Sequence, residues 1–289
     1  MKKLISLLLV FALTLGALFA LTGCKKKDKG VTIAIPSDAT NEARALLLLQ
    51  ANGYLKLKDG AGVTASVRDI EDNPYNISFN EVEAAQLPNV LQDVDYAVIN
   101  SNYALSANLN PAKDSLLSEG ASSEAAQEYA NILAVNASRA DDPLILALAA
   151  ALTSKQVSDF IAREYSGSVI SVVSEPTNGY DDAIDYAALA GQTVRVGASP
   201  APHAEILEVA KQILAEKDIT LEIVTFTDYV LPNNAVNDNE IDANFFQHQP
   251  YLTDFNAENG TDIVSVAAIH FEPLGLYGGK QSSLDAIQK

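Results

Sequence analysis

The sequence predicts an α/β fold in two lobes with a ligand cleft between them. Short β-branched and apolar runs alternate with helix-forming runs along the 289 residues, which is typical of largely parallel sheets covered by helices. One unit, a strand followed by a Ser/Pro-rich loop and a helix, occurs twice, as IPSDATNEARALLLLQ from residue 35 and as GASPAPHAEILEVAKQIL from residue 197. Residues 174–190, between the two units, have turn chemistry without a sustained period, and we interpret them as a linker.

The first half of the chain begins with an apolar strand that stops at Pro36 and leads into the helix former NEARALLLLQ. A later helix is indicated by Asp141-Asp142-Pro143, because acidic residues and Pro favour a first helical turn. Short apolar runs predict strands at 31–35, 63–67, 96–99 and 132–135, and helices are predicted at 41–50, 81–91, 111–117, 143–152 and 154–165.

After the linker the pattern restarts, with strands predicted at 194–197, 219–225, 241–246 and 263–267 and a helix at 203–216. Ligands of open α/β sheets bind beyond the carboxyl ends of the strands. We therefore expect the two Ser/Pro-rich loops to face one shared cleft. There the helix N-termini present free N–H groups and partial positive charge.

The N-terminal residues have the pattern of a secretory signal. Lys2 and Lys3 precede an 18-residue apolar run, which ends in Leu21-Thr22-Gly23-Cys24. This ending resembles a bacterial lipobox, which implies a signal peptide at 1–23, diacylglyceryl attachment at Cys24 and a tether at 24–30. The mature protein would then sit outside the cytoplasmic membrane, held by its lipid. A plain signal peptide or a short membrane anchor with an incidental Cys is the alternative.

Composition excludes several classes of function. The formal charge is −18, and it becomes −20 when Lys2 and Lys3 leave with the signal. Such an acidic chain argues against nucleic acid and against adsorption to anionic lipid. With the single cysteine, Cys24, lipidated, no disulfide or catalytic cysteine remains.

Catalytic and metal motifs are also missing from the sequence. The three histidines lack a spacing such as HExxH, and neither a GxSxG elbow nor a phosphate-binding glycine loop occurs. We therefore expect a binding protein rather than an enzyme, with no cofactor and no metal. An extracellular enzyme on the same fold remains a rival hypothesis, since fold does not fix function.

Arg44 is the main candidate for binding an anion. It is one of five arginines, and it falls near the start of a predicted helix, where the dipole disfavours cations. A guanidinium placed there matches a carboxylate in a bidentate fork, and Asn41, one turn earlier, can bind the same ligand. The alternative is a surface arginine lying along its helix.

Aromatic residues and a histidine at a predicted strand end suggest a pocket for an amphiphilic small molecule. Phe246 and Tyr251 are candidates for walling an apolar group, and His248 for donating a hydrogen bond. Tyr229 is a further candidate wall. A buried aromatic turn or a packed tyrosine would explain the same residues without a ligand.

Several segments resemble the NlpA-type methionine-binding lipoproteins, which are substrate-binding proteins of methionine ABC importers. They are IPSDATNEARALLLLQ, AAQLPNVL, DYAVINSNYAL, GASPAPHAEIL, FTDYVLPN, DANFFQHQPYL and HFEPLGLY. The resemblance implies a two-lobed periplasmic-binding-protein-like (type II) fold, L-methionine as ligand, an ABC importer permease as partner and a lipid-anchored, extracytoplasmic location. A methionine-containing dipeptide, another apolar amino acid or a role as a surface interaction lipoprotein are the alternatives.

The resemblance also implies roles for individual residues. Arg44, in the motif with Asn41, would clamp the ligand carboxylate, and Asn100 would help to hold the amino acid. The residues implied to enclose the ligand side chain are Tyr229, Phe246, His248 and Tyr251.

The order of the segments is exchanged relative to that family, since the part beginning GASPAPHAEIL normally comes first. This resembles a circular permutation, with a fragment of a tandem protein or a misassembled reading frame as the alternatives. We expect one lobe from 31–125 plus 271–289 and the other from 126–270. Residues 174–190 would bridge the usual termini.

Overall fold

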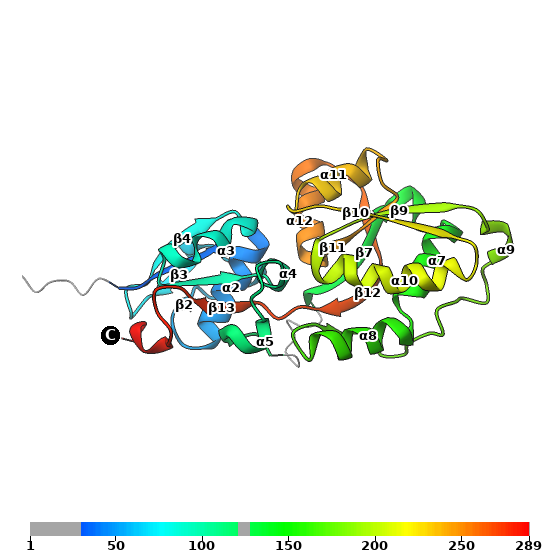
Figure 1. Cartoon of the computed structure of the whole chain (residues 1–289). Coiled ribbons are helices and arrows are strands. Elements are labelled where there is room, and N and C mark those ends of the chain that lie inside the picture. The colour runs from blue at the N-terminus through cyan, green and yellow to red at the C-terminus, as the bar shows by residue number, and fades with distance from the viewer. Residues whose placement is uncertain (1–29, 121–127, 289) are drawn as a thin grey trace, which may run out of the picture.

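Two mixed β-sheets with helices packed against them form two lobes, which are joined by two chain crossings (Figure 1). The computed structural model describes residues 30–120 and 128–288. One crossing lies between β6 (Ser115–Ser118) and β7 (Ala130–Asn136), and the other between β12 (Ile263–Phe271) and β13 (Gly275–Gly278). The predicted two-lobed α/β class is confirmed.

The first lobe contains a five-stranded sheet in the order β4-β1-β5-β13-β6. Strand β1 runs parallel to β4 and β5, whereas β13 runs antiparallel to β5 and β6. Its core holds Val31, Ile33, Leu46 and Leu49. Its further strands are β1 (Thr32–Pro36), β2 (Lys56–Leu57), β3 (Ile70–Asp72), β4 (Ser78–Val82) and β5 (Tyr96–Ile99), and its α-helices are α2 (Ala39–Ala51), α3 (Leu87–Val90), α4 (Ser101–Ser106) and α5 (Pro111–Asp114).

The second lobe contains a six-stranded sheet in the order β10-β9-β11-β7-β12-β8. Its core includes the helix α7 (Pro143–Leu152). This helix is apolar along most of its length, and Leu148 and its helix neighbours are buried in the core. The remaining strands are β8 (Ile170–Ser171), β9 (Thr193–Ala198), β10 (Thr220–Thr225) and β11 (Ala243–His248). The helices are α7 (Pro143–Leu152), α8 (Lys155–Tyr165), α9 (Tyr186–Leu189), α10 (Glu205–Ala215), α11 (Leu231–Asn237) and α12 (Gln249–Asn259).

The expectation of largely parallel sheets is wrong. Strand β9 is parallel to β10 and β11, but β7 is antiparallel to β11 and β12. The strands that flank the two crossings, β6, β7, β12 and β13, all run against their neighbours. Mixed sheets therefore follow from the way the chain passes between the lobes.

Three elements of the first lobe differ from their predictions. The strand predicted at 63–67 is replaced by short 3₁₀ turns, one of them closed by the Asp69 N–H donating to the Ser66 carbonyl at 2.8 Å. Glu81 belongs to β4 instead of a helix, where it pairs with Ile35. Leu117 lies in β6, opposite Leu276, so the helix predicted at 111–117 ends early.

The segment 174–190, interpreted from the sequence as a linker, makes contacts with the second lobe. Thr177 forms a β-bridge with Ser154, and the Tyr180 hydroxyl donates to the carbonyl of Ile213 at 3.1 Å. Leu189, at the end of α9, is 6% exposed within the second lobe's core. The segment is therefore packed along the lobe.

The two ends of the described chain meet in the first lobe. Ile287, which is 1% exposed, belongs to the same hydrophobic cluster as Val31, immediately before β1. No helix in residues 30–120 and 128–288 has the length and apolarity needed to cross a bilayer. The predicted signal peptide, Cys24 and the tether up to residue 29 lie outside the described residues.

Candidate functional site

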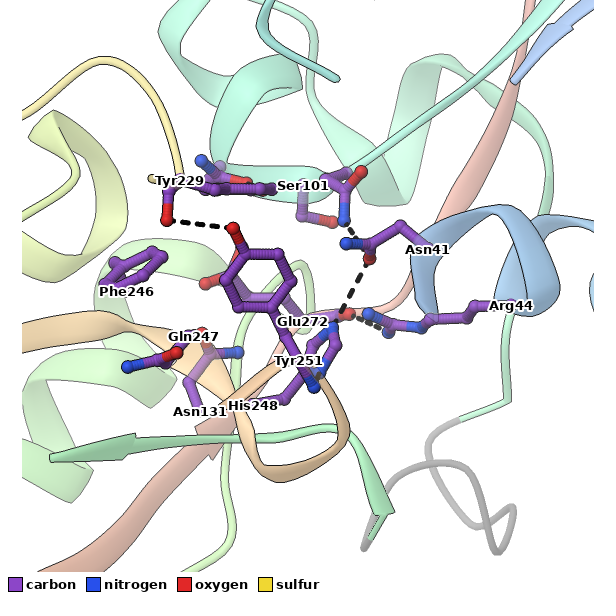
Figure 2. A pocket seen from close by; sticks show the side chains of 12 residues that line it. Asn41, Arg44, Ser101, Asn131, Tyr229, Phe246, Gln247, His248, Tyr251 and Glu272 are labelled. Carbon is purple, nitrogen blue, oxygen red and sulfur yellow. Dashed lines mark hydrogen bonds between the residues drawn. The ribbon is translucent and has the colours of Figure 1, made fainter. Parts of the chain in front are cut away.

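A pocket lies between the lobes, where α2 and α4 of the first lobe face β11 and α12 of the second (Figure 2). The cavity that remains between the side chains measures only about 20 Å³. The lobes are therefore closed onto each other. The lining residues are Asn41, Arg44, Asn100, Ser101, Asn102, Asn131, Tyr229, Phe246, Gln247, His248, Tyr251 and Glu272.

All seven residues selected from the sequence line this pocket, and Figure 2 labels all of them except Asn100. Asn41 and Arg44 come from α2, and Asn100 caps the N-terminus of α4. The other four come from the second lobe: Phe246 and His248 from β11, Tyr251 from α12 and Tyr229 from the loop before α11.

Arg44 is almost fully enclosed, with 3% of its surface exposed. Its Nε and Nη2 donate to the two carboxylate oxygens of Glu119 at 2.9 and 2.6 Å, and Nη2 also donates to the carbonyl of Glu272 at 2.7 Å. The guanidinium lies 4.4 Å from the centre of the Tyr129 ring. The bidentate face of the Arg44 guanidinium is thus already paired with Glu119. Among the described residues, these hydrogen bonds use Nε and Nη2 and leave Nη1 of Arg44 for a ligand.

Asn41 connects the two lobes. Its Nδ2 donates to Asp38 at 2.8 Å, while its Oδ1 accepts from Asn100 Nδ2 at 2.8 Å and lies 3.3 Å from His248 Nε2. Burial, followed by the nearby Arg44 charge, lowers the pKa of His248 well below its usual value. His248 is therefore neutral, with Nδ1 accepting from the Tyr251 N–H at 3.3 Å and the proton on Nε2.

Two buried polar atoms of the lining have no hydrogen-bond partner among the described residues. They are Asn100 Oδ1, an acceptor, and Asn102 Nδ2, a donor. An unpaired buried group costs about 1–3 kcal/mol. A ligand with its own donors and acceptors would remove that cost.

An aromatic wall faces this polar end. Tyr229 lies 5.7 Å from both Phe246 and Tyr251 between ring centres, and 4.9 Å from Tyr103 of the first lobe. The Tyr229 hydroxyl donates to Asn102 Oδ1 at 2.6 Å, which is a second hydrogen bond across the cleft. The pocket therefore combines a polar end with an aromatic, apolar end.

Five lining residues were missed by the sequence analysis: Ser101, Asn102, Asn131, Gln247 and Glu272. Four of them lie inside motifs that were noted, such as DYAVINSNYAL and HFEPLGLY, so proximity to a chosen residue was an available signal. Asn131 stands outside the noted motifs, and only the pairing of β7 with β11 brings it to the pocket.

Gln247 is held in place by buried amides. Its Nε2 donates to Asn233 Oδ1 at 2.7 Å and to Asn244 Oδ1 at 2.9 Å, while its Oε1 accepts from Asn233 at 2.9 Å. Asn244, part of the cluster noted in the sequence, thus supports the pocket from behind without lining it. This network fixes the floor of the pocket.

One group of buried ligand atoms is close enough together for a metal ion. In the described part of the chain, His203, His270 and Glu272 each offer an atom within 4.8 Å of the others. The contacts are hydrogen-bond distances, however: His270 Nε2 lies 2.8 Å from Glu272 Oε1, and His203 Nε2 lies 2.9 Å from Asn131 Oδ1. The structure does not require a metal to explain this group.

The chain is similar in sequence to known lipoproteins. The membrane lipoprotein TpN32 of Treponema pallidum is 40% identical over 142 residues, covering 49% of this chain and 52% of that protein. The D-methionine-binding lipoprotein MetQ of Escherichia coli is 35% identical over 161 residues, covering 53% and 58%. The chain thus spans about half the length of the curated relatives it matches.

Among solved structures, a nutrient binding protein from Burkholderia cenocepacia bound to methionine is 46% identical, with a TM-score of 0.46 over 51% of this chain and 61% of that one. The model of the NlpA lipoprotein family matches residues 22–173 and 194–289. Because these two ranges make up well over half of the sequence, the chain belongs to the NlpA lipoprotein family.

Proposed function

We propose that this protein is a lipid-anchored, extracytoplasmic binding protein that captures L-methionine or a close analogue and delivers it to an ABC importer. The observation that carries the proposal is the closed pocket between the lobes, in which a polar end faces an aromatic wall. A free amino acid with a long apolar side chain has matching ends. The protein binds its ligand without transforming it.

The polar end suits an α-carboxylate. Arg44 Nη1 and the Asn41–Asn100 pair are the groups that we assign to it. Charge-assisted hydrogen bonds are about twice as strong as neutral ones, so a buried carboxylate here would be strongly held. At the other end, Phe246, Tyr229 and Tyr251 would enclose a thioether, since sulfur makes favourable contacts with aromatic rings.

Capture would involve opening of the lobes. The cavity is too small for an amino acid in this closed form, and the contacts Asn41–His248 and Asn102–Tyr229 join the two lobes across it. The connection at 272–274, between β12 and β13, is a place where a hinge can act. A ligand that pairs with both lobes would favour the closed form.

Ligand analysis and calorimetry test the proposal. Mass spectrometry of the purified protein should detect methionine, and ligand-free refolded protein should bind L-methionine far more tightly than L-alanine. Phe246→Ala should weaken methionine binding by about tenfold to a hundredfold, since burying a large apolar side chain is worth about 1.5–3 kcal/mol. Alanine binding should change little. Binding of a methionine dipeptide alone, or of no amino acid, contradicts the proposal.

The anchor is tested separately at Cys24. Cys24→Ala should move the protein from the membrane fraction to the soluble fraction, because the lipid would have no thiol to attach to. Cys24→Ala protein that stays with the membrane points instead to an apolar segment as the anchor.

A further inference from the structure

Among the residues that the structure describes, one buried carboxylate in the pocket lining has no lysine or arginine as an ion-pair partner. Glu272, directly after β12, is 5% exposed and lines the pocket. Its Oε1 lies 2.8 Å from His270 Nε2 and 3.2 Å from His203 Nε2, and both histidines are completely buried. Arg44 touches Glu272 only through the main-chain carbonyl, because its guanidinium is paired with Glu119.

The proton positions on the two histidines follow from their surroundings. The Nδ1 atoms of His203 and His270 are buried and have no partner in the described ranges. A proton on Nδ1 would therefore be an unsatisfied buried donor, and an Nε2 without a proton would place its lone pair against the carboxylate oxygen. Each ring therefore carries its proton on Nε2: His270 donates it to Glu272 Oε1 at 2.8 Å, and His203 donates it to Asn131 Oδ1 at 2.9 Å. Burial, which lowers the pKa of His203 well below its usual value, agrees with this state.

The same reasoning disfavours a metal ion on these side chains. A histidine bound to a metal through Nε2 carries its proton on Nδ1 and normally donates it to a carboxylate, a carbonyl or water. Neither Nδ1 has such an acceptor here among residues 30–120 and 128–288. The group is better described as a carboxylate that accepts a hydrogen bond from His270, with His203 beside it bonded to Asn131.

This carboxylate has no lysine or arginine within ion-pair distance in the described chain. Burial of an ionised carboxylate is costly unless it is paired and hydrogen-bonded, and among the described residues the groups within ion-pair distance of it are the two imidazoles. The His270 N–H holds the carboxylate in position. A cationic ligand group is what the site lacks.

We propose that Glu272 binds the α-ammonium group of the ligand, with His270 as its positioning residue. This inference rests on the proposed function and extends it: the pocket recognises a zwitterion, with Arg44 at its carboxylate and Glu272 at its ammonium. Compounds that have the thioether chain and the carboxylate but lack the amine should be discriminated against.

The test compares L-methionine with 4-(methylthio)butanoate, which lacks only the amino group, by calorimetric titration. Glu272→Gln should weaken L-methionine binding at least about tenfold, as expected for a lost buried charge-assisted contact. Binding of 4-(methylthio)butanoate should stay within about threefold of the wild type. The matched control is Glu42→Gln on α2, where an equally buried Glu accepts from the Val67 N–H at 2.7 Å outside the pocket. It should leave both affinities unchanged.

A second variant tests the positioning role and protects the test against misfolding of the first. His270→Leu removes the hydrogen-bond donor to Glu272. It should lower the ratio of the affinity for L-methionine to the affinity for 4-(methylthio)butanoate, while 4-(methylthio)butanoate still binds. A purely structural role would weaken both compounds alike and leave the ratio unchanged.

The outcomes separate the two proposals. If the wild type binds no methionine, the proposed function fails and takes this inference with it. If the wild type binds methionine and Glu272→Gln binds it equally well, only the ammonium site is overturned. Zn²⁺ that raises the melting temperature of the wild type but not of Glu272→Gln would overturn it in favour of a metal site.

Discussion

At the scale of single residues, Arg44 shows what a sequence can and cannot reveal. Its place near the start of a predicted helix, against the dipole, singled it out as an anion binder, although α2 begins at Ala39 and Arg44 lies beyond its first turn. The structure adds that its side chain joins both crossings, through the carboxylate of Glu119 and the carbonyl of Glu272. Glu119 lies 75 residues away along the chain, so no local pattern could have indicated the pair.

The Arg44–Glu119 pair predicts a loss of stability when Arg44 is removed. The two side chains are 4% and 8% exposed, so Arg44→Ala would leave Glu119 buried and unpaired. Breaking a buried ion pair from one side typically costs about 3–5 kcal/mol. Denaturant unfolding of Arg44→Ala without ligand should show a loss of this size.

A compensating variant provides the control for this prediction. Adding Glu119→Gln to Arg44→Ala should restore part of the stability, since it removes the orphaned charge. An unchanged unfolding midpoint in the single variant would contradict the account. For ligand binding, Arg44→Lys is the cleaner probe, because it keeps the charge and loses only the planar fork.

At the scale of elements, short apolar runs predicted the buried strands correctly, but one apolar run that forms exposed turns was mistaken for a strand. The strand Tyr96–Ile99, buried at all four positions, was predicted at its observed bounds. The run at 63–67 looks equally β-branched, yet Val63 is 42% exposed. Composition alone does not tell whether a short apolar run finds a neighbouring strand, and that distinction depends on contacts distant in sequence.

The segment 174–190 carries a prediction at this scale. Leu189 packs into the second lobe's core, so Leu189→Ala should destabilise the protein by about 2–4 kcal/mol, as for other buried leucines. Asp182→Ala, at an exposed position of the same segment, should have little effect. Thermal or urea unfolding of both variants measures this, and equal stability would contradict the packing of Leu189 in the core.

At the scale of the whole molecule, the two-lobed class was predictable because the strand–loop–helix unit occurs twice. The mixed direction of the strands was not, because it depends on how the crossings at 119–129 and 272–274 enter each sheet. The closure of the cleft also escaped prediction. It rests on pairs such as Asn41–His248, whose partners are 207 residues apart.

The exchanged segment order predicts neighbouring chain ends. We propose a circular permutation, supported by the shared cluster of Val31 and Ile287 and by the packing of 174–190 along the second lobe. Spin labels at residues 29 and 289 should report a short distance by pulsed resonance methods. A rearranged chain in which residues 191–289 precede 30–173 should bind the same ligand. Distant labels would favour a tandem fragment.

The position of β13 has a consequence for the order in which the protein is made. Strand β13 lies inside the first lobe's sheet, between β5 and β6, and β6 has no other strand as a partner in the described chain. All strands of the second lobe lie between residues 130 and 271. A chain that emerges N-terminus first therefore starts the first lobe early, finishes the second lobe's strands next, and closes the first sheet only when residues 275–278 appear. Until then the nascent first lobe is left with open strand edges, which are sites for association with other chains.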